Sequence, residues 1–92
     1  VGKKEIILFK SEEKQDRQSA VAFLHELVDK IGTGEVILRQ GDQEVVVNIP
    51  HNFVLELKVE EEHKKNSVKM GLEIELEWVP GQDNDGGGVS LG

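Results

Sequence analysis

Residues 67–80, SVKMGLEIELEWVP, alternate between apolar and polar side chains along almost their whole length. The apolar set is Met70, Leu72, Ile74, Leu76 and Trp78, and the alternate set is Lys69, Gly71, Glu73, Glu75 and Glu77. Successive side chains of a strand point to opposite faces, so the pattern predicts a β-strand with one buried face and one wet face. No catalytic or cofactor pattern elsewhere in the chain is as strong.

The length of 92 residues predicts one domain with a modest core, because small domains bury a limited share of their surface. We place this domain at residues 1–80. Residues 81–92 are rich in Gly, Asp and Asn and offer almost nothing to bury, so we expect a disordered C-terminal tail.

The net charge of −7 argues against two classes of partner. Nucleic acids and anionic membrane surfaces are bound through Lys and Arg, and an acidic chain is repelled by both. The chain has no cysteine, which excludes disulfides, thiolate nucleophiles and Cys-ligated zinc and fits a reducing compartment. The four consecutive apolar residues Ile6 to Phe9 are too few for a signal peptide or a membrane span, so we expect a cytoplasmic protein.

The N-terminal half of the domain predicts a strand followed by a helix. Residues 5–10 contain a continuous apolar run that favours a short strand. Ser11 stands at a typical N-cap position, and apolar residues then recur at helical spacing from Ala20 to Ile31. Gly32 is placed to end this helix in the left-handed conformation.

The C-terminal half predicts strands joined by short turns. Residues 35–40 and 43–49 are two strands separated by Gly41-Asp42, a typical hairpin junction. Residues 53–61 alternate again, and the polar run 61–66 is expected to connect them to the strand at 67–80. The resulting order is β-α-β-β-β-β. It predicts an α+β fold: a two-layer sandwich with one long helix packed on a mostly antiparallel sheet.

Two features of the last strand are candidates for interaction. Glu73, Glu75 and Glu77 form a row on the wet face, with Glu56 and Glu60 expected beside them, and alternate carboxylates can attract a divalent cation or a basic peptide. The simpler interpretation is a solvated face that prevents aggregation. Trp78 is expected either to close the edge of the core or to anchor a partner.

Four segments together resemble a known family: Phe9–Glu13 entering a helix, Gly34–Val36, Val45–Pro50, and Leu72–Trp78. They are similar to the Amphi-Trp domain family, small prokaryotic proteins of unknown function named for an amphipathic strand ending in tryptophan. The resemblance stops at Pro80. It implies a free-standing cytoplasmic bacterial or archaeal protein with no known activity, so it assigns no site residues.

The sequence therefore favours a non-enzymatic protein-interaction module that uses a sheet edge or its Glu-rich face. We expect no catalytic residues, no cofactor and no dedicated metal site. The alternative is a weak binder of divalent cations or small cationic ligands through Glu73, Glu75 and Glu77. Expected partners are an unknown protein or a second copy of the chain, because an exposed edge strand can pair with its symmetry mate.

Overall fold

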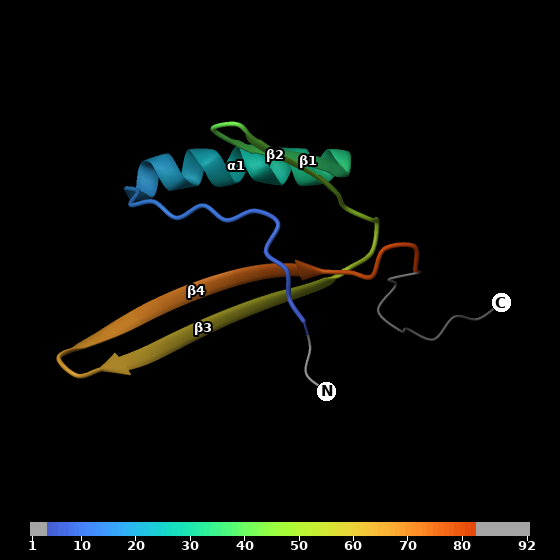
Figure 1. Ribbon diagram of the computed structural model, residues 1–92. Helices are drawn as coiled ribbons and strands as arrows, with labels where there is room; N and C mark the ends of the chain where they lie inside the picture. Colours follow the sequence, from blue (N-terminus) through green and yellow to red (C-terminus); the bar gives the residue numbers. More distant parts are fainter. Residues whose placement is uncertain (1–3, 83–92) are drawn as a thin grey trace. The chain divides into compact units, whose positions relative to one another are not determined.

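The computed structural model describes residues 4–82, which form one helix and four strands (Figure 1). These are α1 (Arg17–Thr33), β1 (Glu35–Gln40), β2 (Gln43–Asn48), β3 (Val54–Lys64) and β4 (Ser67–Glu77). The fold is α+β, and the strands pair antiparallel in two two-stranded sheets, β1–β2 and β3–β4. The chain divides into two compact units, Val1–Ile49 and Pro50–Gly92. Of the predicted tail, residues 83–92 lie outside the described residues.

Helix α1 begins later than predicted, because its N-cap is Asp16 rather than Ser11. The Asp16 carboxylate accepts a hydrogen bond from the Ser19 backbone N–H at 2.7 Å, and this bond lowers the pKa of Asp16. Residues 12–15 have no apolar side chain to bury, and most helical stability in proteins comes from packing rather than propensity. The polar segment therefore stays outside the helix.

The helix also ends later than predicted. Gly32 remains inside α1, and Gly34 takes the left-handed conformation with φ 87°. Its N–H donates to the Ile31 carbonyl at 3.0 Å, which satisfies one of the free carbonyls at the helix end. Within the last turn, the Thr33 hydroxyl donates to the Lys30 carbonyl.

The core of the first unit lies between α1 and the β1–β2 hairpin. Val36 and Leu38 on β1 pair with Val47 and Val45 on β2, as the sequence predicts, so the four side chains share one face. Helix α1 packs against β1 and contributes the half-buried side chains of Ala20, Leu27 and Ile31. Val36 is 5% exposed and is the only buried side chain among residues 4–82.

The strand predicted at residues 5–10 is wrong, because this segment is irregular in the structure. An apolar run forms a strand only where a neighbouring strand offers it a ladder of hydrogen bonds. One side-chain hydrogen bond joins the segment to the hairpin instead: the Gln43 amide donates to the Leu8 carbonyl at 2.9 Å. The side chains of Ile6, Ile7 and Leu8 are exposed.

The second unit is the β3–β4 hairpin, which is longer than predicted. The polar residues 61–64, expected to be a loop, continue β3 and pair with the start of β4, leaving Lys65 and Asn66 as the turn. Each further pair adds ladder hydrogen bonds, so the hairpin closes to a two-residue connection. At the other end, β4 stops at Glu77, before Trp78 and Pro80.

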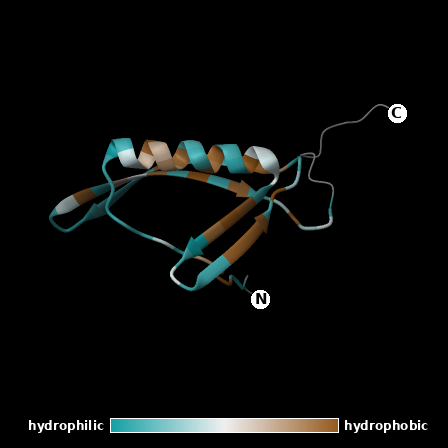
Figure 2. Ribbon diagram, turned by 90° about the horizontal axis from the view of Figure 1, so that it is seen from above, coloured by the Kyte–Doolittle hydropathy of each residue, from teal (hydrophilic) through white to brown (hydrophobic). Residues whose placement is uncertain are grey.

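Most of the β4 side chains that the sequence predicts to be buried are exposed. Hydrophobic residues colour the strands of both hairpins brown in Figure 2, and on β4 the side chains of Met70, Leu72 and Ile74 are exposed. Leu76 is half-buried. The sequence pattern therefore predicted which residues share a face, whereas burial depends on what packs against that face.

Candidate acidic site on the β3–β4 hairpin

The register of the β3–β4 hairpin brings three carboxylates together on one face. Glu56 lies directly opposite Glu75, and Glu77 is the next residue of β4 on the same side. Ligand oxygens of Glu56, Glu75 and Glu77 all lie within 4.8 Å of one another. We refer to these three residues as the acidic cluster. All three side chains are exposed, so the cluster is open to an approaching partner or ion.

Lys58 separates the acidic cluster from the other acids of this face. Its ammonium group lies 2.8 Å from the Glu60 carboxylate and 3.3 Å from the Glu73 carboxylate. These two hydrogen-bonded acids, Glu60 first, raise the pKa of Lys58 above its ordinary value, so the ammonium stays charged. Glu73 is neutralised by this cross-strand pair, whereas the acidic cluster has no lysine at the corresponding position.

Glu75 shows the electrostatic cost of the cluster. Its pKa is raised above the ordinary glutamate value, first because its protonated carboxyl can hydrogen-bond to Glu77 and then because the Glu77 charge repels its own. Glu56 and Glu73 add smaller repulsions. Like charges held close together favour the protonated form. A positive group placed here would relieve that repulsion.

The structure divides the row of acids predicted from the sequence. Glu73, Glu75 and Glu77 do lie on one face, but Glu73 belongs to the Lys58 ion pair. Glu56, expected beside the row, completes the cluster from β3, and Glu60 bonds to Lys58 instead. The missing signal was the strand register, because only the pairing of Lys58 with Glu73 decides which acid is neutralised.

Trp78 lies one residue beyond β4 and is half-buried. It lines a hollow of about 530 Å³ at the base of the hairpin together with Val54, Leu76, Glu77 and Val79. The predicted tryptophan at the end of the amphipathic strand is therefore partly packed and partly accessible, and it adjoins Glu77 of the acidic cluster.

A model of the Amphi-Trp domain family matches residues 2–92, the whole chain apart from Val1. The chain belongs to this family. The match reaches residue 92, so it extends beyond Pro80, where the resemblance was expected to stop. No curated protein and no solved structure matches the chain. Along residues 4–82 of the Amphi-Trp domain, no helix has the length and apolar character needed to cross a membrane.

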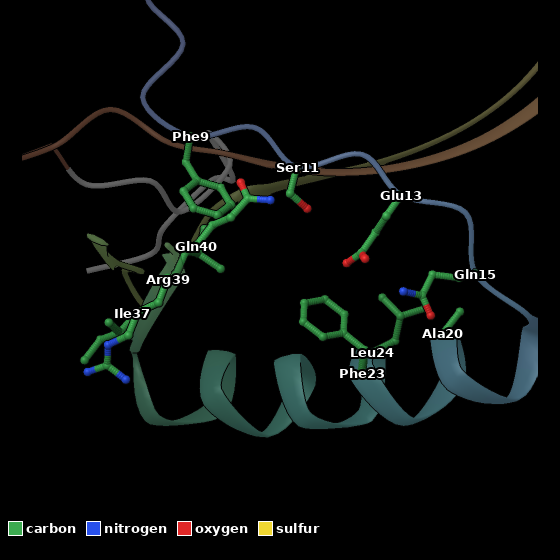
Figure 3. Close-up of a pocket in the computed structure, with 11 residues that line it drawn as sticks. Phe9, Ser11, Glu13, Gln15, Ala20, Phe23, Leu24, Ile37, Arg39 and Gln40 are labelled. Atoms are coloured by element: carbon green, nitrogen blue, oxygen red, sulfur yellow. The ribbon is translucent and has the colours of Figure 1, made fainter. Parts of the chain in front are cut away.

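The first unit of this Amphi-Trp domain contains a separate hollow of about 570 Å³ (Figure 3). Phe9, Ser11 and Glu13 of the N-terminal segment line one side, and α1 faces them with the side chains of Phe23 and Leu24. Arg39 at its rim is bonded to Glu44 at 2.7 Å. The residues that line the hollow include apolar side chains and one carboxylate, that of Glu13. This combination does not indicate a particular reaction.

Proposed function

We propose that this domain is a non-enzymatic protein-interaction module that binds a basic segment of another protein through the acidic cluster. The observation that carries the proposal is the convergence of Glu56, Glu75 and Glu77 on an exposed face where no lysine lies opposite them. A Lys or Arg side chain of a partner would supply the positive charge that Lys58 supplies to Glu73. Half-buried Trp78, next to Glu77, is placed to add apolar contact at the edge of this surface.

The two free strand edges of this hairpin support the same proposal. Among the described residues of the second unit, β3 and β4 pair with each other, so within this unit each has an outer edge of backbone groups that a partner strand could pair with. A basic strand added beside β4 would place its side chains next to Glu75 and Glu77. We therefore expect an extended basic segment rather than a helix as the partner.

The test compares two triple variants that remove the same three charges. One replaces Glu56, Glu75 and Glu77 by Gln, and the control replaces Glu5, Glu12 and Glu26, which lie in the first unit. Binding partners are captured from a lysate at low and high salt, and binding is quantified with a synthetic Lys/Arg-rich peptide. We expect the cluster variant to lose salt-sensitive binding and the control to retain it, because exposed charges are screened by salt. Equal losses in both variants would show only a net-charge effect and would contradict the proposal.

A second candidate function is weak binding of a divalent cation by the same cluster. The specific observation is that three carboxylates can each offer one oxygen within 4.8 Å of the others. Carboxylate oxygens are the preferred ligands of Ca²⁺ and Mg²⁺, but a stable site requires more ligands than three. Titration with Ca²⁺ and with Mg²⁺, followed by amide chemical shifts, should move the amides of residues 56, 75 and 77 and not those of α1. Unmoved amides at these positions would exclude this function.

A cellular setting and a finer arrangement of the fold complete the proposed function. We place the protein in the cytoplasm of a bacterium or archaeon, supported by its acidic charge and lack of cysteine, with neither nucleic acid nor membrane as its partner. We also propose that the helix and the two hairpins pack as the single two-layer sandwich predicted from the sequence. Nuclear Overhauser contacts between β2 and β3 would identify it.

A further inference from the structure

We draw no further inference here: the strongest candidate, the hollow of the first unit between the N-terminal segment, α1 and β1, carries none, because nothing in the structure shows what covers its aromatic and aliphatic walls.

Discussion

Val36 is the residue on which the first unit depends most. Its side chain is 5% exposed and lies between β1 and α1, whereas Val46 on the other side of the same sheet is 48% exposed. Removing buried methyl groups costs transfer free energy and leaves a cavity. We expect Val36→Ala to lower the free energy of unfolding by about 1.5–3 kcal/mol. Val46→Ala makes the same change on the exposed side, and urea denaturation should show a clearly smaller loss for it.

The raised pKa of Glu75 makes the stability of the folded protein depend on pH. Its raised native pKa means that the folded protein binds this proton more tightly than the unfolded chain. The resulting stabilisation is fully present when the pH is below the pKa of Glu75 in the unfolded chain, which is near the ordinary glutamate value of 4.5. It is lost as the pH rises through the pKa of Glu75 in the folded protein. Glu75→Gln should therefore raise the thermal midpoint at neutral pH and flatten its decline above pH 4.5.

The control for this prediction is Glu26→Gln, the same change on α1. A decline in thermal midpoint that persists unchanged in Glu75→Gln would show that another group causes it. If the control flattens the decline as much as Glu75→Gln does, the effect is one of net charge and not of the cluster.

At the scale of the element, the two glycines near the end of α1 have different roles, because Gly32 lies inside the helix and Gly34 caps it. Gly34 has a φ of 87°, which residues with a Cβ rarely adopt, whereas Gly32 lies inside the helix, where an added Cβ would meet no atom within 4 Å. Gly34→Ala should destabilise the protein by about 1 kcal/mol, because an L-residue is strained in the left-handed region. Gly32→Ala should stabilise it by about 0.5–1 kcal/mol, since Ala is the better helix former. Thermal unfolding of the two variants should therefore shift in opposite directions, and shifts of the same sign would contradict this assignment of the helix end.

The sequence predicted elements where the pattern is local and long. The β1–β2 hairpin, the face pattern of β4 and the body of α1 agree with the structure, because alternation, helical spacing and Gly41-Asp42 act within a few residues. The errors lie where strand pairing decides the outcome. Residues 5–10 pair with no strand among the described residues, whereas the polar residues 61–64 pair with the start of β4 across a two-residue turn.

The same distinction applies to the candidate site. The sequence placed Glu75 and Glu77 on one face and expected Glu56 beside them, which the register confirms. It did not predict that Lys58 neutralises Glu73, because charge pairing across strands depends on which residues lie opposite. The spacing of carboxylates along one strand therefore predicts the charged cluster less well than the register between the two paired strands.

At the scale of the whole molecule, the two units differ in what each can bury within itself. The first unit has its own small core around Val36, whereas the second is a single hairpin of two strands. A lone two-stranded hairpin is marginally stable at best. We therefore expect weaker hydrogen-exchange protection for the amides of β3 and β4 than for those of α1 and β1, and equal protection in both units would contradict this prediction.

Every strand pair in residues 4–82 joins neighbours along the chain, and α1 packs on the strand that follows it. The chain therefore closes only short loops before contacts form, and such local topologies fold fast, in the range of microseconds to milliseconds. The first unit, which has its own small core, can become ordered as soon as it leaves the ribosome. The second unit is a single hairpin, so its strands can pair quickly but gain lasting order only when their leucines pack against another element. That packing step, and not strand pairing, would then limit the rate of maturation.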